Sequence, residues 1–532
     1  MIHIDKDECT GCAGCIDLCP TITLTLRDDK SWYKEPPCKS ACREACPIHM
    51  NVPGYLYHAK QGDYKKAYEV LRETNPLPAI CGRVCYHPCE EACNRGSIDQ
   101  PLAIASLKRF ISDQVDSDTL EVPQIAKNGK KVAVVGSGPA GLTAAHDLAL
   151  AGYDVTVFEA LKEPGGMLRY AIPEYRLPKE VLKKEIKYIE NLGVQIKTGA
   201  KVGEQVKLDE LTKSYDAVFI AAGANKDVKL GIPGEQTPGV VYALEFLQDV
   251  NSGKKVNPGK NVIVIGGGNS AIDAARVSRR LGGKVTIIYR RSRTEMPAYA
   301  AEVEAVEKEG VEIVFLAAPT KIIAANGKVS KIECIRMKLG PADASGRPAP
   351  IPQKGSEFTV DADTIIPAIG QAPDGELLKG LGLKLSQSER LLVDEKSMNT
   401  NVKGIFAGGD VVTGPLSVVD AMASGRQAAC SIDSYLHGES VRSAEKGVPE
   451  KLNQEEIAAL KKRFPSRKRV SMPELPSEKR VKDFKEVEQG YSVEQAREES
   501  ERCMTTCIFC EICRIVCPAQ AISLNGKSQQ AI

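Results

Sequence analysis

The chain has 532 residues, more than one hydrophobic core usually organises, so several domains are expected, on the order of three to five. A hydrophobic content of 42%, a charged content of 26% and a formal net charge of +2 are ordinary for a globular protein and speak against nucleic-acid binding. No run of about 18 apolar residues occurs, and the start, MIHIDKDECTGC, lacks the layout of a signal peptide, so we expect a cytoplasmic protein without a membrane span.

The first expected element is a ferredoxin-like module over residues 1–30. Its cysteines have the C-x2-C-x2-C-x3-C-P spacing of bacterial ferredoxins, which holds thiolates around a 4Fe–4S cluster. A zinc site would normally need two separated pairs of ligands. The predicted ligands are Cys9, Cys12, Cys15 and Cys19.

Residues 31–125 are expected to form a helical domain rich in cysteine. Helical patterns between residues 50 and 112 are interrupted by cysteines that recur every four residues. In a long chain without a secretion signal, such rows indicate metal or redox ligation rather than disulfides. The candidate ligands are Cys38, Cys42, Cys46, Cys81, Cys85, Cys89 and Cys93.

Residues 126–440 alternate β-branched runs with glycine turns, which predicts an α/β fold of parallel strands and crossover helices. We expect two nested Rossmann-type domains: an FAD-binding domain at 126–240 and 376–440, with an NAD(P)-binding domain at 241–375 inserted into it. The expected strands are 131–135, 154–160, 217–223, 261–267, 284–290 and 404–410.

The FAD assignment depends on a complete dinucleotide fingerprint. Gly136 permits a tight turn, Gly138 lets the backbone approach a pyrophosphate, and Gly141 lets the helix pack on its strand. The pyrophosphate would sit at the amino terminus of that helix, and Glu159, at the end of the second strand, would bind a ribose. Pro139 and Ala140 complete the loop.

A second flavin signal follows the strand at 404–410. Asp410, after Gly409, would accept hydrogen bonds from ribityl or ribose hydroxyls, and the helix starting near Ser417 would oppose negative charge on a reduced ring. With Ala222 and Gly223, these residues resemble flavoproteins with two dinucleotide-binding domains. Many of those carry a redox-active cysteine pair, but no C-x2-C or C-x4-C occurs between 131 and 436, so electrons are expected to leave by another route.

The nicotinamide site is expected at a second fingerprint, formed by Gly266, Gly268, Asn269 and Ser270, with alanine at the third glycine position. An NAD site would place an acid after the second strand, whereas this sequence has arginines. Because a guanidinium can bond a 2′-phosphate through two N–H groups, we favour NADP(H) over NAD(H). A solvated basic loop is the alternative. The arginines are Arg290 and Arg291, and Gly370 closes the domain.

Residues 441–498 are charged and proline-containing, and are expected to form a linker with a short helix near 492–502. Residues 499–532 repeat the ferredoxin spacing, and Cys503 either ligates there or is spare. Half a ferredoxin has little core, so the two ends either dock on each other or sit on different partners. The predicted ligands are Cys507, Cys510, Cys513 and Cys517.

Residues 38–436 resemble the glutamate synthase small-subunit family, which is related to the amino-terminal half of dihydropyrimidine dehydrogenase and to the large subunit of NADH-dependent ferredoxin:NADP oxidoreductase. The motifs are CGRVCYHPCEEAC (81–93), PLAIASLKRF (101–110), EPGGMLRYAIPEYRLPKE (163–180) and YRRSRTEMPA (289–298). The resemblance implies cofactor contacts at Gly166, Leu168 and Arg176.

The resemblance also implies two 4Fe–4S clusters in residues 38–110. One of the two would be completed by a Glu or Gln where this sequence has Lys108. By the family pattern, one cluster would use Cys46, Cys85 and Cys89, and the other Cys38, Cys42 and Cys93. Lysine is a cation and a poor ligand. Cys81 has no clear assignment, and seven cysteines for eight places leave open whether this domain holds one cluster or two.

The favoured interpretation is an oxidoreductase subunit that exchanges hydride between NAD(P)H and FAD and relays single electrons through three to four 4Fe–4S clusters. Its partner in a hetero-oligomeric complex would be ferredoxin or a catalytic subunit, such as a 2-oxoacid or aldehyde oxidoreductase. A glutamate synthase small subunit and a redox sensor or cluster-bearing assembly subunit without turnover are the alternatives. No acid–base residue is required, so none is named.

Overall fold

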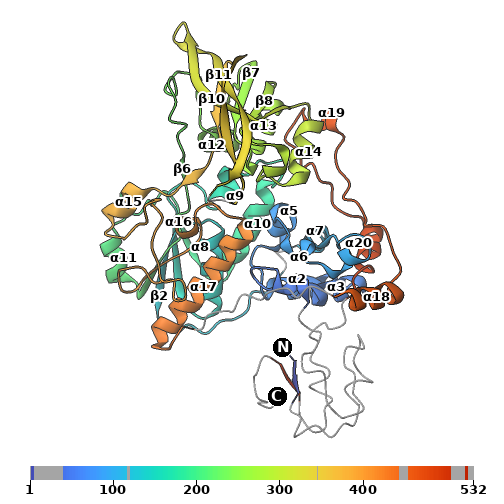
Figure 1. Cartoon of the computed structure of the whole chain (residues 1–532). Coiled ribbons are helices and arrows are strands. Elements are labelled where there is room, and N and C mark those ends of the chain that lie inside the picture. Colours follow the sequence, from blue (N-terminus) through green and yellow to red (C-terminus); the bar gives the residue numbers. More distant parts are fainter. Residues whose placement is uncertain are drawn as a thin grey trace. The chain divides into compact units, whose positions relative to one another are not determined.

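A computed structural model describes residues 2–4, 40–116, 120–343, 346–441, 453–504 and 522–524 (Figure 1). The chain divides into two compact units. The N-terminal unit comprises Met1–Leu120, Ala444–Pro473 and Gly490–Ile532. The central unit comprises Glu121–Ser443 and Glu474–Gln489.

The helical domain expected in the N-terminal unit is present. Side chains cap two of its helices: Asn51 accepts a hydrogen bond from Gly54 N (3.0 Å), and Asp63 accepts one from Lys66 N (2.9 Å). At Gly82 a Cβ would lie 2.7 Å from the Cα of Arg109, so glycine lets α5 and α7 approach closely. The helices are α2 (Ala41–Glu44), α3 (Val52–Lys60), α4 (Tyr64–Arg72), α5 (Pro78–Val84), α6 (Pro88–Glu91), η1 (Asn94–Ser97) and α7 (Ile104–Gln114).

Two parallel sheets form the core of the central unit, as the nested Rossmann prediction required. The five-stranded sheet has the order β15-β5-β2-β3-β4, and the four-stranded sheet β13-β7-β8-β9 is built from the chain between β5 and β15. Strands buried on both faces explain the continuous Val and Ile runs. The strands are β2 (Lys131–Val135), β3 (Asp154–Phe158), β4 (Gln195–Lys197), β5 (Ala217–Ile220), β7 (Asn261–Ile265), β8 (Lys284–Tyr289), β9 (Glu312–Phe315), β13 (Thr364–Pro367) and β15 (Ile405–Ala407).

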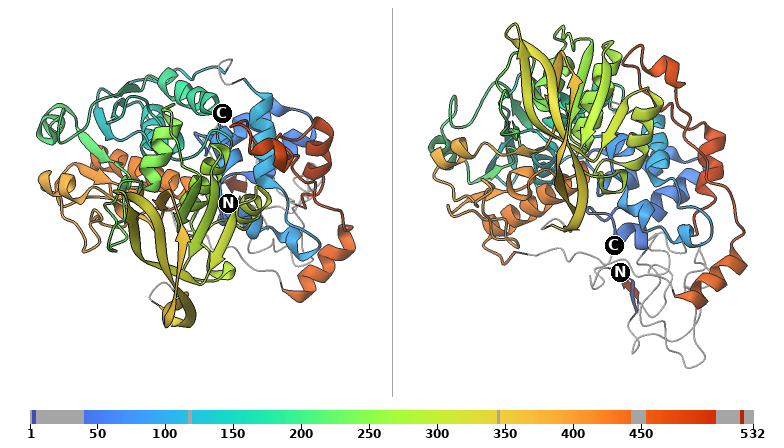
Figure 2. Two further views of the ribbon diagram at one scale, coloured as in Figure 1. Left: turned by 90° about the horizontal axis from the view of Figure 1, so that it is seen from above. Right: turned by 45° about the horizontal axis from the view of Figure 1, so that its top comes forward.

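A third sheet, antiparallel and of order β10-β11-β12, packs its apolar residues against the four-stranded sheet. Its long strands are yellow in both views of Figure 2. They are β10 (Ala317–Ala325), β11 (Lys328–Ala342) and β12 (Pro348–Asp361), and a small pair is formed by β6 (Lys226–Asp227) and β14 (Gln371–Ala372).

Helix α17 packs closely on α8 in the central unit (Figure 1). A Cβ at Gly425 would lie 2.1 Å from the carbonyl oxygen of Ala140, so only glycine fits this crossing. Within the described ranges, no helix has both the length and the apolar character needed to cross a membrane. The helices are α8 (Pro139–Leu150), α9 (Met167–Tyr170), α10 (Lys179–Asn191), α11 (Leu208–Ser214), α12 (Ala243–Asn251), α13 (Asn269–Arg280), η3 (Arg293–Glu295), α14 (Ala300–Lys308), α15 (Gly375–Gly380), α16 (Asp410–Thr413) and α17 (Val418–His437).

Parts of the segment predicted as a linker are helical. The segment forms α18 (Gln454–Arg463), α19 (Ser477–Arg480) and the expected short helix, α20 (Val493–Ser500). Residues 474–489 are part of the central unit, where Val487 N donates to Tyr175 O (3.0 Å) and the Val487 side chain is buried. Some charges of the segment are paired: Arg469 bonds Glu90 (2.7 Å) and Arg480 bonds Glu474.

The two ends of the chain meet at one pair of strands. β1 (Ile2–Ile4) and β16 (Ile522–Leu524) are antiparallel, with Ile2 opposite Leu524. The predicted ligands Cys9–Cys19, Cys38 and Cys507–Cys517 lie outside the described residues. The strands therefore favour docking of the two ends on each other over separate placement.

Candidate functional site

The loop after β2 leaves space for a phosphate where the fingerprint predicts it. Gly136 has φ +101°, and a Cβ there would lie 2.4 Å from Ala221 O, while a Cβ at Gly141 would lie 2.0 Å from Gly136 O. Neither position tolerates a side chain. A Cβ at Gly138, by contrast, would meet no heavy atom of the described chain within 4 Å. Gly138 is the N-cap of α8, where unpaired N–H groups and the helix dipole favour an anion.

The carboxylate of Glu159 is held beside this loop. It accepts hydrogen bonds from Ser137 N (3.1 Å), from the Ser137 hydroxyl and from Leu161 N (2.8 Å). The Ser137 hydroxyl in turn accepts from Gly165 N (2.9 Å). Sequence reasoning missed Ser137, although its place inside the fingerprint was the available signal. The geometry fits an acid positioned to bind ribose hydroxyls.

The motif at 163–168 packs over the same loop. A Cβ at Gly166 would lie 2.8 Å from Gly138 Cα, so glycine lets this segment pass next to the phosphate cradle. The side chain of Leu168 is fully buried. Gly166 therefore lies at the predicted site, and the Leu168 side chain contributes packing there.

The second flavin motif meets the first in the fold. A Cβ at Gly409 would lie 2.9 Å from the Cβ of Ala140, in the first turn of α8 beside Pro139. Asp410 begins α16, accepts a hydrogen bond from Leu416 N (3.3 Å), and has its pKa raised to about 6 by burial. The predicted pairing of the fingerprint with Asp410 is thus geometrically consistent.

Other predicted flavin contacts also stand at element ends. Ser417 is the N-cap of α17 and accepts a hydrogen bond from Asp420 N (3.2 Å). Ala222 and Gly223 directly follow β5, the strand beside β2 in the sheet. These positions are at the carboxyl edge of the parallel sheet, where α/β folds bind ligands.

The second fingerprint repeats the geometry of the first. A Cβ at Gly266 would lie 2.2 Å from Ala368 O, whereas one at Gly268 would meet no described heavy atom within 4 Å. Asn269 begins α13 and accepts a hydrogen bond from Tyr299 N (3.2 Å), and Ser270 follows it half-buried. Gly370 lies just before β14. The open space over Gly268 again suits a pyrophosphate.

The two arginines predicted to read a 2′-phosphate have different environments. Arg290 is exposed immediately after β8. Arg291 is 2% exposed, donates to Pro348 O (2.8 Å) and forms an ion pair with Asp343. Its guanidinium is thus committed to the β11–β12 hairpin. This corrects the prediction for Arg291 and leaves Arg290 as the phosphate candidate.

Arg176, predicted to contact a cofactor, instead belongs to a buried ion-pair network. It bonds Asp273 (2.8 Å) on α13 and Glu302 (3.1 Å) on α14. Those carboxylates raise the pKa of Arg176 against the effect of burial, so the guanidinium stays charged. The structure therefore assigns Arg176 to holding the 163–180 motif against the four-stranded sheet domain.

The side chain of Lys108 on α7 is buried, and burial would lower its pKa, but the charges of four cysteines of the N-terminal unit, Cys85, Cys81, Cys89 and Cys46, raise it. Burial raises the pKa of Cys81 to about 12, and the Lys108 ammonium opposes that rise while the charges of Cys85 and Cys46 add to it. Burial also raises the pKa of Cys89, and the Lys108 ammonium again opposes that rise. Cys81 therefore shares the electrostatic influence of Lys108 with Cys89.

A donor set made of cysteines suits an iron–sulfur cluster. Two thiolates on one zinc lie at most about 4.6 Å apart because each bond is about 2.3 Å. In the described parts of the chain, no three His, Cys, Asp or Glu side chains are spaced to hold one metal ion. Thiolates that bind four different irons are spread further, and Lys108 would offset the negative charge of such a cluster.

A family model described as pyridine nucleotide-disulphide oxidoreductase matches residues 130–425, more than half of the chain. The chain belongs to this family. A second model, dihydropyrimidine dehydrogenase domain II with a 4Fe-4S cluster, matches residues 36–120. The chain is thus an oxidoreductase, and the two models support flavin and iron–sulfur cofactors, as the motifs predicted.

Relatives of this oxidoreductase include three subunits of larger enzymes. The beta subunit of NADP(+)-dependent formate dehydrogenase from Moorella thermoacetica is 42% identical over 87% of this chain and 70% of its own length. The beta subunit of NADPH-Fe(3+) oxidoreductase from Geobacter sulfurreducens is 37% identical over 87% and 74%. The glutamate synthase [NADPH] small chain of Escherichia coli is 37% identical over 74% and 88%. The predicted resemblance is confirmed.

A solved structure supports the fold of this oxidoreductase. Mycobacterium tuberculosis FprA in complex with NADPH has a TM-score of 0.50 and 23% identity, covering 63% of this chain and 90% of that chain. The predicted nested α/β architecture is confirmed.

Proposed function

We propose that the protein is an NADPH-oxidising flavoprotein subunit that passes single electrons through iron–sulfur clusters to, or from, a catalytic partner. The observation that carries this proposal is the combination of two open phosphate cradles, over Gly138 and Gly268, with buried cysteine groups in the same chain. Bound FAD would supply the conversion between a hydride and single electrons.

The chain's own residues would bind and orient these groups. Gly138 and the α8 terminus would hold the FAD pyrophosphate, Glu159 its ribose, and Asp410 a hydroxyl further along the cofactor. Gly268 and the α13 terminus would hold the nucleotide pyrophosphate. Hydride transfer needs aligned rings rather than an acid–base pair, so positioning is the main task of the protein.

NADP(H) is the proposed nucleotide. Arg290 stands exposed after β8, where a 2′-phosphate would be recognised, and three relatives carry NADP(+) or NADPH in their names. The buried Arg291 would shape the loop rather than touch the nucleotide.

A partner of the formate dehydrogenase or metal-reductase kind is favoured over the large subunit of glutamate synthase. The Moorella and Geobacter relatives align with 87% of this chain, whereas the glutamate synthase small chain aligns with 74%. The Moorella and Geobacter relatives therefore match more of this chain than the glutamate synthase small chain does, which suits a protein with additional cluster-binding segments. Ferredoxin and another oxidoreductase subunit remain the proposed partner classes.

The domain plan is proposed with one revision. Residues 31–125 hold clusters, residues 126–440 form the nested dinucleotide domains, and both chain ends contribute to one ferredoxin-like module, supported by the β1–β16 pair. A location in the cytoplasm follows from the need to keep many thiolates reduced.

Anaerobic NADPH oxidation with a viologen acceptor tests this function. We expect sustained, NADPH-dependent viologen reduction by the purified chain without a partner, because flavin and clusters would lie on the same polypeptide. A redox sensor or assembly subunit would show no turnover. A preparation with full FAD and iron content that fails to oxidise NADPH would contradict the proposal.

Replacing Arg290 with alanine tests the nucleotide preference. Loss of one charged hydrogen bond costs about 1.5–3 kcal/mol, so the Michaelis constant for NADPH should rise roughly tenfold or more, with little change for NADH. Arg293→Ala is the matched control, because Arg293 is exposed nearby but paired with Glu307 (2.5 Å). Equal effects of Arg290→Ala on both nucleotides would contradict recognition of the 2′-phosphate.

A further inference from the structure

Cys503 lies at the end of a helix that the structure describes. It belongs to the N-terminal unit, is half-buried, and follows α20, with its N–H donating to Ser500 O (3.2 Å). The contacts that fix the C-terminal end of α20 therefore also fix the position of Cys503.

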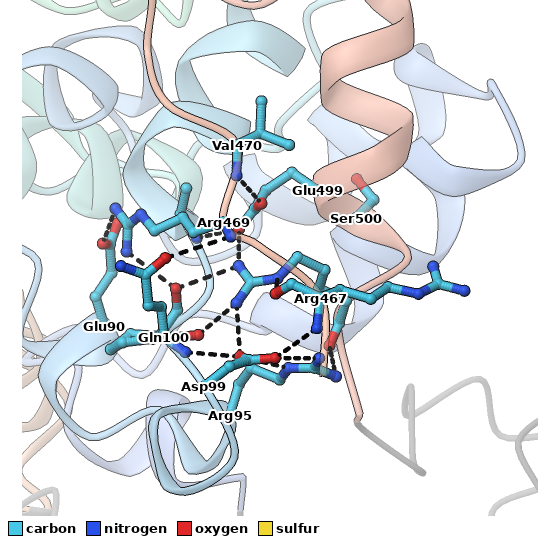
Figure 3. A network of polar contacts seen from close by, with 12 residues as sticks. Glu90, Arg95, Asp99, Gln100, Arg467, Arg469, Val470, Glu499 and Ser500 are labelled. Carbon is cyan, nitrogen blue, oxygen red and sulfur yellow. Dashed lines mark hydrogen bonds and ion pairs between the residues drawn. The ribbon is translucent and has the colours of Figure 1, made fainter. Parts of the chain in front are cut away.

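Arg502, directly before Cys503, anchors this turn in a buried polar network. Figure 3 shows labelled members of this network, among them Asp99 and Glu499. The side chain of Arg502 is fully buried and bonds the carboxylates of Glu499 (2.6 Å) and Asp99 (2.9 Å). It also donates to the carbonyl oxygens of Gln100 (2.5 Å) and Arg467 (3.1 Å). A buried arginine with this many partners fixes the backbone at Cys503, because breaking such a network leaves charge unpaired in the interior.

The same network reaches the loop that carries Cys93. Arg95 bonds Asp99 through Nε (2.9 Å) and Nη2 (2.5 Å), and its Nη1 donates to the carbonyl oxygen of Arg502 (3.4 Å). Burial alone would raise the pKa of Asp99, but hydrogen bonds, led by that from Arg95, lower it well below its usual value, so the carboxylate is charged. A direct bond thus joins the residue before Cys503 to a residue two positions after Cys93.

The bond between Arg95 and the carbonyl oxygen of Arg502 (3.4 Å) brings the backbone at Cys503 beside the loop that carries Cys93. In agreement with this placement, the charge of Cys503 adds to the rise that burial causes in the pKa of Cys42 and of Cys93, against the hydrogen bonds that lower both. Cys93 Sγ additionally accepts backbone hydrogen bonds from Leu102 and Arg95. Such bonds favour a thiolate and tune cluster sulfurs.

We propose that Cys503 is a ligand of a second 4Fe–4S cluster in the N-terminal unit, together with Cys42 and Cys93. The sequence prediction assigns the remaining place to Cys38. Cys46, Cys81, Cys85 and Cys89 then serve the first cluster, so eight cysteines fill eight places. On binding iron, the Cys503 thiol loses its proton to solvent. This ligand assignment depends on the proposed function in one respect: it requires that the protein binds iron–sulfur clusters.

The assignment links the relay to the end of the chain. Cys503 is four residues before Cys507, and four residues span at most about 14 Å. A ligand of the second cluster and the first ligand of the terminal row are therefore close by chain length alone, which suits electron passage between them.

Cys503→Ser in the full chain, reconstituted anaerobically with iron and sulfide, tests the proposal. Iron content should fall by about four per chain, or one low-temperature EPR signal of the reduced protein should change. Cys93→Ser should alter that same signal, and the double variant should lose no more iron than either single variant. Cys430→Ser, at an exposed position on α17, is the control.

Two results would overturn the proposal: unchanged iron and EPR in Cys503→Ser, or a change in the signal that Cys517→Ser alters. FAD content reports whether each variant has folded, and flavin reduction by NADPH tests the proposed function separately from the ligand assignment. If Cys503→Ser is not recovered folded, alkylation of Cys93→Ser decides the question. There Cys503 should become reactive toward iodoacetamide while Cys513 and Cys517 stay protected, and continued protection of Cys503 would refute the assignment.

Discussion

Gly138→Trp is expected to yield a folded protein that has lost nearly all of its FAD. The added side chain starts from a position with no described heavy atom within 4 Å, so it would project into the space that the pyrophosphate needs without striking the protein. Loss of several kcal/mol of phosphate binding lowers affinity by more than about a hundredfold, since each 1.4 kcal/mol is tenfold. Flavin absorbance per chain after gel filtration measures the effect.

The second cradle provides the matched control for this variant. Gly268→Trp places the same side chain at the corresponding open position before α13. It should keep FAD and lose NADPH oxidation. Gly138→Trp with a full complement of FAD would refute the flavin site, and loss of FAD in both variants would indicate general misfolding.

Glu309→Ala should lower the free energy of unfolding of the central unit by about 3–5 kcal/mol, because it leaves buried charges unpaired. Both oxygens of the Glu309 carboxylate are used, with Arg276 at 2.7 Å and Arg280 at 2.6 Å. The side chains of Glu309 and Arg280 are wholly buried, and the Arg280 guanidinium lies 3.8 Å from the centre of the Tyr175 ring. Urea unfolding followed by flavin fluorescence measures the change.

Glu307 is the control for this prediction. It forms an ion pair with Arg293 but is 38% exposed, so Glu307→Ala should cost no more than about 1 kcal/mol. Comparable destabilisation by the two variants would show that burial of the network is not what makes Glu309 important.

The ion pairs of Glu309 with Arg280 and Arg276 also predict that the stability of the central unit falls in acid. Burial would raise the pKa of Glu309, but hydrogen bonds from Arg280 and Arg276 lower it below the value of an unfolded glutamate. A lowered folded pKa means that the stabilisation is complete above the unfolded pKa of about 4.3 and is lost as the pH falls through the folded pKa. Glu309→Ala should therefore reduce the loss of stability on acidification.

Local patterns in the sequence were sufficient for the dinucleotide loops. Strand, glycine turn and helix are consecutive, so the backbone conformation at Gly136 and the open position at Gly138 follow from residues only a few positions apart. The helical character of residues 50–112 and the helix near 492–502 were predictable for the same reason.

Side-chain roles that depend on distant partners were not predictable. Arg290 and Arg291 are identical residues side by side, yet Asp343 and Pro348, more than 50 positions away, draw only Arg291 inward. Arg176 likewise lies in a family motif, but Asp273 determines its contacts.

The sequence by itself determined the nested α/β fold and the two open glycine turns, because short spacings and local backbone preferences carry that information. Only the tertiary structure decided which loops lie together, such as those of Arg95 and Arg502, and which charges are buried. Arg95 and the backbone of Arg502 are in contact although they are 407 positions apart in the sequence. The cost of burying a charged side chain is offset only when the fold brings its partners next to it, and sequence spacing does not show which partners these are.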